Sequence, residues 1–254
     1  MGAVRLLLYN IRYGIGSGST MRWPVPGMGY VIGNRPNLNR IIQFIESQDP
    51  DVVGLVEVDT GSIRSQRVNQ AEAIGRSLGH YSVYQCKYAE SSLNQLLPIV
   101  RKQGNAFLAA PRVHGERFHY FDRGIKRLTI ELELEECSIF LVHLSLKYRH
   151  RQEQLRALHD LVVASPKPVL IAGDFNTFWG GHEIYLFMKA AGLRSANSHG
   201  LPSYPSNSPR KELDFVLYGD GIEIENFYIP AVSFSDHLPL VCDFVINGSA
   251  VAAA

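Results

Sequence analysis

Two polar residues, Asp174 and Asn176, directly follow a short apolar run at residues 169–172. The run comes after Pro166-Lys167-Pro168 and is typical of a buried strand. If the strand geometry continues, both side chains leave on the same face. A carboxylate beside an amide at such a point can hold a metal ion, a water molecule or a phosphate. The simpler alternative is an Asx turn, in which the two residues cap the loop.

Other apolar runs along the chain also carry polar residues at or near their ends. Together with the first pair they are Asn10, Glu57, His143, Asp174, Asn176, Asp214, Asp236 and His237. One residue of this kind means little, but a series at comparable positions predicts one cluster at one edge of the sheets. Carboxylate and amide oxygens suit a hard cation such as Mg²⁺ or Mn²⁺. The two histidines add proton transfer or charge stabilisation near neutral pH.

The composition limits the partners of the whole chain. With 254 residues and a formal net charge of +1, the protein can bury a sizeable core and has no global field that draws it onto nucleic acid or an anionic membrane. No repeat, low-complexity block or linker divides the chain. We therefore expect a single domain over residues 1–247 and a disordered tail over residues 248–254.

The cysteines and the amino-terminal residues indicate the cellular compartment of the protein. Cys86, Cys137 and Cys242 stand far apart without a CxxC pair, which argues against a disulfide framework and a structural zinc site. The apolar run at residues 6–8 is too short for a secretory leader. No run approaches the length of a membrane-spanning helix. These observations predict a cytoplasmic protein.

Hydrophobic periodicity predicts the elements that position the polar residues. Helices are expected at residues 37–47, 69–79, 151–164 and 183–191. Strands are expected at residues 4–10, 52–58, 81–88, 104–110, 127–135, 138–146, 169–174, 213–218, 222–228 and 240–246. Because strands outnumber helices and some neighbours form hairpins, two sheets packed face to face with helices outside fit better than a doubly wound parallel sheet.

Some segments are harder to interpret. The strand at 127–135 alternates apolar and polar residues, which predicts one solvated face. The long irregular segment 11–34 contains Trp23, Met28 and Tyr30, which favours an ordered flap. The apolar residues 91–101 are interrupted by Pro98 and fit neither a helix nor a strand clearly.

A set of motifs runs in order from the first expected strand to the last. They are Tyr9-Asn10-Ile11-Arg12, Val53-Gly54-Leu55-Val56-Glu57-Val58-Asp59, Val142-His143-Leu144, Gly173-Asp174-Phe175-Asn176, Leu213-Asp214-Phe215-Val216 and Ser235-Asp236-His237-Leu238-Pro239. In combination they resemble the motifs of the endonuclease/exonuclease/phosphatase superfamily. The resemblance implies an α/β fold, a four-layer sandwich of two packed mixed β-sheets flanked by helices. It also implies hydrolysis of phosphate esters with Mg²⁺.

Carried over by position, the resemblance implies a metal site. Glu57 is the expected principal ligand, Asn10 assists it, and Asp236 completes the surroundings of the ion. Magnesium is the expected metal, with manganese as the alternative. Magnesium commonly takes one or two carboxylates and fills the rest of its shell with water and substrate phosphate.

The same resemblance implies roles in the reaction. Asp174 is expected to orient and deprotonate the attacking water, and Asn176 to hydrogen-bond a phosphoryl oxygen or the nucleophile. His237 faces the phosphate and stabilises its developing charge, while Asp214 holds the imidazole ring. His143 is expected near the leaving group or a phosphate oxygen. An in-line attack on phosphorus needs a polarising cation, an activated water and donors aimed at the new charge.

Three positions refine the resemblance. The abasic-site nucleases carry an acidic residue where Arg12 stands and tend to lack a histidine at the position of His143. The usual glutamine before the metal-binding glutamate is replaced by Val56. The chain is therefore closer to the deoxyribonuclease, sphingomyelinase and inositol-phosphatase side of the superfamily.

Two basic stretches have alternative interpretations. Arg123 and Arg127 either reach a substrate phosphate or lie solvated before a strand, and the second is favoured. Lys147-Tyr148-Arg149-His150-Arg151 either touches a phosphate backbone or acidic lipid headgroups, or forms a solvated helix start.

The leading functional hypothesis is a Mg²⁺-dependent phosphoesterase that hydrolyses a small or lipid-like phosphodiester. The alternatives are a Mg²⁺-dependent nuclease on DNA or RNA and a catalytically silent binding scaffold. The candidate partners are accordingly a phosphate ester, nucleic acid or the lipid of a membrane surface. The sequence does not decide the substrate or the oligomeric state.

Overall fold

The structure is a computed structural model that describes residues 2–17, 35–86, 102–110, 113–124 and 126–247. Several expectations lie outside the described residues. They concern most of the segment 11–34, with Trp23, Met28 and Tyr30, the segment 91–101 and the tail 248–254.

Two six-stranded sheets form the centre of the fold. The first contains β1 (Val4–Asn10), β2 (Val52–Asp59), β3 (Tyr81–Cys86), β4 (Gln103–Ala109), β11 (Ile222–Tyr228) and β12 (Leu240–Ile246), in the order β11-β12-β1-β2-β4-β3. The second contains β5 (Val113–Tyr120), β6 (Leu128–Leu134), β7 (Ser138–His143), β8 (Val169–Asp174), β9 (Arg194–Ser195) and β10 (Asp214–Tyr218), in the order β5-β6-β7-β8-β10-β9.

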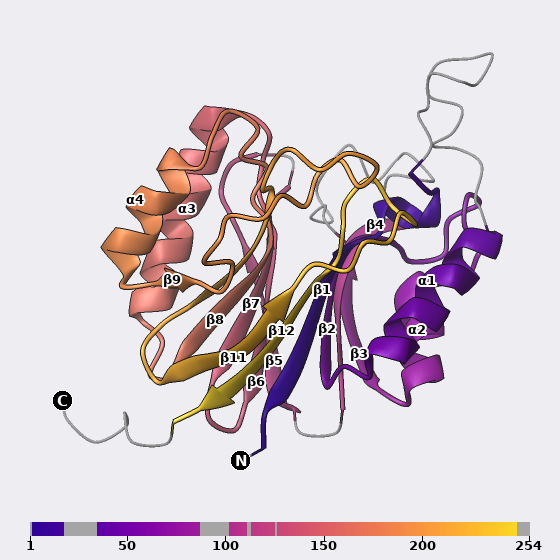
Figure 1. Ribbon diagram of the computed structural model, residues 1–254, viewed down its shortest axis with the longest axis horizontal. Coiled ribbons are helices and arrows are strands. Elements are labelled where there is room, and N and C mark those ends of the chain that lie inside the picture. The colour runs from indigo at the N-terminus through magenta and orange to yellow at the C-terminus, as the bar shows by residue number, and fades with distance from the viewer. Residues whose placement is uncertain (1, 18–34, 87–101, 111–112, 125, 248–254) are drawn as a thin grey trace.

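Helices cover the outer faces of both sheets (Figure 1). Helices α1 (Arg35–Gln48) and α2 (Gln70–Leu78) pack on the first sheet. Helices α3 (Tyr148–Val163) and α4 (His182–Ala191) pack on the second. The predicted sandwich of two mixed sheets between helical layers is therefore confirmed.

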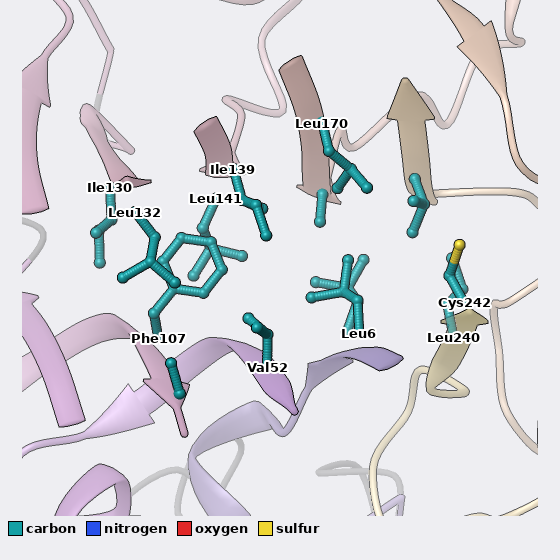
Figure 2. Close-up of a cluster of buried hydrophobic side chains, with 14 of the residues drawn as sticks. Leu6, Val52, Phe107, Ile130, Leu132, Ile139, Leu141, Leu170, Leu240 and Cys242 are labelled. Carbon is teal, nitrogen blue, oxygen red and sulfur yellow. The ribbon is translucent and has the colours of Figure 1, made fainter. Parts of the chain in front are cut away.

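The alternation of β1 shows how one strand serves two cores. Leu6 and Leu8 point into the apolar layer between the sheets, part of which is drawn in Figure 2. Leu7 and Tyr9 point the other way and pack under α1. A strand buried on both faces must be apolar throughout, which explains its continuous hydrophobic run.

Strand direction brings the polar residues to one edge. β1 and β2 run parallel, as do β7 and β8, so the carboxyl ends of each pair lie together. β10 is antiparallel to β8 and begins there, with Asp214 opposite Asp174. β12 is antiparallel to β1 and begins opposite Leu8. This arrangement explains why Asp214 stands early in its strand and why Asp236 and His237 precede theirs.

Helix ends follow the local sequence. The side chain of Asn69 accepts hydrogen bonds from the backbone N–H groups of Ala71 and Glu72 and caps α2. Gly79 adopts the left-handed conformation, with φ 69°, and ends the helix as the sequence predicts. The α3 helix begins at Tyr148, earlier than expected.

Two strands were not predicted. β5 carries His, Glu and Arg residues along an edge strand, so it lacks the apolar alternation that marks a strand. β9 has only two residues and is held by β10.

The prediction of a solvated face on the strand at 127–135 was wrong. Thr129 and Glu131 of β6 are buried. Glu131 lies 2.8 Å from His119 Nε2 on β5 and accepts a hydrogen bond of 3.1 Å from Ser138 on β7. Polar partners on both neighbouring strands replace water at this face, which the sequence of one strand does not reveal.

All three cysteines are free thiols. Among the described residues, no helix combines the length and apolar character needed to cross a membrane.

Candidate active site

A hydrogen bond between the two sheets marks the centre of the site. Asn10 Nδ2, at the end of β1, donates to Asp174 Oδ2, at the end of β8, over 3.2 Å. Asp174 Oδ1 accepts the backbone N–H of Asn176 over 2.9 Å, and the Asn176 amide donates to the Leu144 carbonyl over 3.0 Å. The Asx turn and the cluster of polar side chains are therefore both present. Oδ1 of Asp174 accepts the hydrogen bond of the turn, and Oδ2 accepts the hydrogen bond from Asn10.

Strained backbone surrounds this centre. Glu57 has φ 58° at an irregularity of β2, where its pairing with β4 shifts between Leu55 and Val58. Arg12 and Asn176 also have positive φ, at 45° and 54°. Left-handed backbone at residues other than glycine is uncommon and concentrates at functional sites.

His143 lies close to two of the carboxylates of the site. Its Nε2 lies 3.4 Å from Asp174 Oδ2 and 3.8 Å from Glu57 Oε1. The Lys126 ammonium contacts the same His143 nitrogen and lies 3.9 Å from Glu57 Oε1. Both sheets therefore contribute charged groups to one small volume.

A second buried pair lies beside the first group. His237 Nδ1 is 2.7 Å from Asp214 Oδ2, which also accepts the Ser203 hydroxyl over 2.6 Å. Burial lowers the pKa of His237, but the charge and hydrogen bond of Asp214 prevail and raise it to about 10. The imidazole is therefore protonated at neutral pH, with its second N–H available to an acceptor. The ring of Tyr204 packs 4.9 Å from His237.

Asp174 is ionised although it is buried. Desolvation opposes its charge, but the hydrogen bond from His143 and the positive charge of His237 outweigh this cost and lower the pKa of Asp174. A buried carboxylate held in its charged form can accept a proton from a water molecule placed against it.

Arg12 links Asp236 to Asn10. The Asp236 carboxylate is 3.3 Å from Arg12 Nε, and the backbone N–H of Arg12 donates to Asn10 Oδ1 over 3.1 Å. Burial raises the pKa of Asp236, although His237 and Arg12 act against this rise. Arg12, at the position where the abasic-site nucleases are acidic, thus neutralises a carboxylate of the site.

The profile of the Endonuclease/Exonuclease/phosphatase family matches residues 7–237. The chain belongs to this family. The matched span contains every residue of the cluster, from Asn10 to His237. Members of the family are typically hydrolases that act on phosphate esters.

Two curated relatives are similar to part of this chain. The UPF0294 protein VP2298 of Vibrio parahaemolyticus is 29% identical over 125 residues, which cover 48% of this chain and 43% of the relative. The uncharacterized protein YbhP of Escherichia coli is 33% identical over 111 residues, which cover 40% of this chain and 44% of the relative. The chain thus matches less than half the length of either relative.

Solved structures share the fold at low sequence identity. An endonuclease/exonuclease/phosphatase from Beutenbergia cavernae has a TM-score of 0.72 at 19% identity, covering 100% of this chain and 74% of that one. The mannosyl-6-phosphatase Bt3783 of Bacteroides thetaiotaomicron has a TM-score of 0.68 at 13% identity. The match covers 96% of this chain and 100% of that one. ANGEL2, a 2′,3′-cyclic phosphatase solved with adenosine-2′,3′-vanadate, has a TM-score of 0.65 at 16% identity. The match covers 97% of this chain and 96% of that one.

Two groups of side chains were considered for a divalent cation. Ligand atoms of Asp174, Asp214 and His237 lie within 4.8 Å of one another. A hydrogen bond of 2.7 Å accounts for the closeness of Asp214 and His237, and Mg²⁺ prefers oxygen ligands over an imidazole nitrogen. This group is therefore a hydrogen-bonded network, in which the histidine itself supplies the positive charge.

The second group, Glu57, Asn10 and Asp236, fits a hard cation better. It offers only oxygen donors, as Mg²⁺ prefers. The Glu57 and Asp236 side chains are 18% and 25% exposed, so both can be reached from solvent. Each carboxylate has a cation nearby, Lys126 at Glu57 and Arg12 at Asp236, as expected where negative charge is concentrated.

The other basic residues considered from the sequence do not join the site. Arg123 is exposed and lies 3.6 Å from Glu153. Arg127 donates to the carbonyl of a nearby loop residue. Arg151 is fully buried and pairs with Glu183 at 2.6 Å, so the interpretation of its basic run as a solvated helix start was wrong at this residue.

Sequence reasoning missed Lys126. The usable signal was its spacing, since Lys126 stands two residues before Leu128 and continues the row with Ile130 that faces the other sheet. Arg127 continues the opposite row with Thr129. Choosing between them needed the direction of β6 relative to β7, which the sequence alone does not supply.

Proposed function

We propose that this protein is a Mg²⁺-dependent phosphoesterase that hydrolyses a small or lipid-like phosphodiester by in-line attack of water. The observation that carries the proposal is the buried, ionised Asp174, held between Asn10 and His143 and close to the protonated His237. A proton acceptor and a fixed positive charge within one small volume are what attack by water on phosphorus requires.

The residues divide the reaction between them. Asp174 takes a proton from the attacking water while the new P–O bond forms and the bond to the leaving oxygen breaks. His237 donates its remaining N–H to a phosphoryl oxygen, and Asp214 fixes the ring and its charge. Asn176 hydrogen-bonds the nucleophile or a phosphoryl oxygen, and His143 stands near the leaving group.

Glu57, Asn10 and Asp236 are the residues that would hold Mg²⁺, with Mn²⁺ as the alternative. When bound, the ion supplies positive charge to the phosphoryl oxygens as a Lewis acid. The all-oxygen donor set and the exposure of both carboxylates support this assignment.

The substrate class rests on charge. A net charge of +1 gives no general attraction to long duplex DNA, which favours a small or lipid-like phosphodiester. Nuclease activity is the second candidate, since the description of the matched family includes endonucleases and exonucleases. A nuclease that contacts many phosphates would lose activity steeply with rising salt, whereas a small-ester hydrolase would not.

The test is cleavage of a substrate panel with Mg²⁺ or with a chelator. The panel contains plasmid DNA, an abasic oligonucleotide, a choline-headgroup sphingolipid, an inositol polyphosphate and a sugar phosphate. We expect turnover of one class, abolished by the chelator. Silence of the whole panel together with the absence of Mg²⁺ binding would favour the scaffold alternative.

Two variants probe the site in the same assay. Asp174→Ala and His237→Ala should each lower the rate by at least roughly a hundredfold in a folded protein, because each removes a group that acts in the transition state. His199→Ala, which changes an exposed histidine, is the control. Wild-type turnover in either folded site variant contradicts the assignment.

A further inference from the structure

Lys126 brings a further positive charge to the site. Its side chain, 19% exposed, contacts His143 Nε2 and lies 3.9 Å from Glu57 Oε1. It stands just before β6, whereas His143 ends β7 and Glu57 belongs to β2. The contact therefore joins the start of β6 and the end of β7 to the irregular part of β2.

Strand register fixes this position. β6 and β7 are antiparallel, with Thr129 opposite Val142, so the start of β6 lies beside the end of β7. Lys126 belongs to the row of β6 that faces the other sheet, and at this edge that row meets the site. Lys126 lies two residues before β6, and the connection is held next to it by the hydrogen bond of 2.8 Å from the Phe121 N–H to the Arg127 carbonyl.

The two contacts do not satisfy the ammonium group. It has three N–H donors, and the single nitrogen of His143 that it contacts can satisfy at most one of them. Glu57 Oε1, at 3.9 Å, is an ion-pair partner beyond hydrogen-bond distance. A lysine in this position is suited to an anionic oxygen that enters the site beside Glu57 and His143.

We propose that Lys126 is a further catalytic residue, which binds a non-bridging phosphoryl oxygen of the substrate beside Glu57 and His143. The proposal rests on the phosphoesterase function above. His237 and Lys126 then supply two positive charges to the phosphoryl group while Asp174 activates the water. Charge that develops on the phosphoryl oxygens in the transition state is stabilised by such fixed donors.

The competing explanation is that Lys126 only neutralises Glu57. The two explanations differ in what a Lys126→Ala variant does to ligand binding. A phosphate-binding lysine is needed for anion affinity, whereas a counter-ion of Glu57 competes with a cation for the same carboxylate.

The experiment titrates inorganic phosphate and, separately, Mg²⁺ into the wild-type protein and its Lys126→Ala and Lys126→Arg variants by calorimetry. Arg123→Ala is the matched control, since it removes an exposed positive charge from the same segment without touching the site. Steady-state kinetics on the substrate found in the panel follow for all four proteins.

We expect Lys126→Ala to weaken phosphate binding by at least roughly tenfold and to lower kcat/KM by about a hundredfold. Lys126→Arg should recover part of both losses, because it keeps the charge, and Arg123→Ala should match the wild type. Absence of phosphate binding in the wild type, unchanged phosphate affinity in Lys126→Ala, or only tighter Mg²⁺ binding in that variant overturns the proposal. A wild type that binds phosphate but cleaves no ester refutes the proposed function. In that case, the comparison of phosphate affinity between the wild type and Lys126→Ala still tests whether Lys126 binds the anion.

Discussion

At the scale of single residues, His237 and Asp214 form a fixed ion pair in a buried setting. Asp214 Oδ2 lies 2.7 Å from His237 Nδ1 and is also held by Ser203. The pKa of His237 is about 10, against an ordinary value of 6.5. The folded state binds this proton more tightly than the unfolded chain, so the stability it contributes is complete below about 6.5 and is lost as the pH rises toward 10.

Asp214→Asn should shift this titration to lower pH. Without the carboxylate charge, burial prevails and the pKa of His237 falls, so the alkaline decline of kcat/KM should begin at lower pH. We expect the rate at pH 8 to drop by roughly ten- to a hundredfold. The checks are the pH–rate profile and an NMR titration of the His237 ring. Asp220→Asn, at an almost fully exposed residue, is the control, and an unchanged His237 pKa would refute the argument.

The polar residues that the structure brings together could be found from the sequence because their types and their places beside apolar runs are local properties. Asn10, Glu57 and Asp174 all follow this rule. Lys126 could not be singled out in this way, because its relevance depends on which strand lies beside β6. The positive φ of Glu57 was also beyond the sequence, since a bulge arises from pairing between two strands.

At the scale of elements, the α3 and α4 helices are joined by a buried ion pair. Arg151 of α3 lies 2.6 Å from Glu183 of α4, and its Nη1 donates to the carbonyls of Ser145 and Leu146. Those carbonyls belong to the loop that follows His143. One side chain therefore fixes both the helix pair and the loop behind the site.

Arg151→Ala should lower the free energy of unfolding by about 3–5 kcal/mol, because it leaves Glu183 as an unpaired buried charge. Urea denaturation measures this loss. Arg156→Ala on the exposed face of the same helix should change stability by less than about 0.5 kcal/mol. Equal free energies of unfolding in the two variants would mean that the Arg151–Glu183 ion pair contributes no more to stability than the exposed charge of Arg156.

The elements that the sequence predicted well are those with a strong period or a clear cap. β1 and α2 are examples, the second closed by Gly79. β5 was missed because an edge strand rich in charge gains its place from pairing with β6 and not from its own pattern. The buried Glu131 has the same origin, since its partners lie on the strands on either side.

At the scale of the whole molecule, the site exists only where the two sheets meet. Asn10 and Glu57 come from the first sheet, and His143 and Asp174 from the second. The apolar layer between the sheets, with Leu6 and Phe107 on one side, sets the distance between these groups (Figure 2). A cation bound by Glu57, Asn10 and Asp236 would therefore stabilise an edge that both sheets form.

Mg²⁺ should accordingly protect the whole fold against heat. Binding to the native state alone adds about 2.7 kcal/mol at a hundredfold excess over Kd, or roughly 5–10 °C in Tm for a chain of this size. Glu57→Gln should remove most of this shift, because it takes away the principal charged ligand, while Glu225→Gln, on the exposed side of β11, should keep it. Calorimetric scans with Mg²⁺ and with chelator measure all three proteins. An equal shift in Glu57→Gln and wild type would place the cation elsewhere in the molecule.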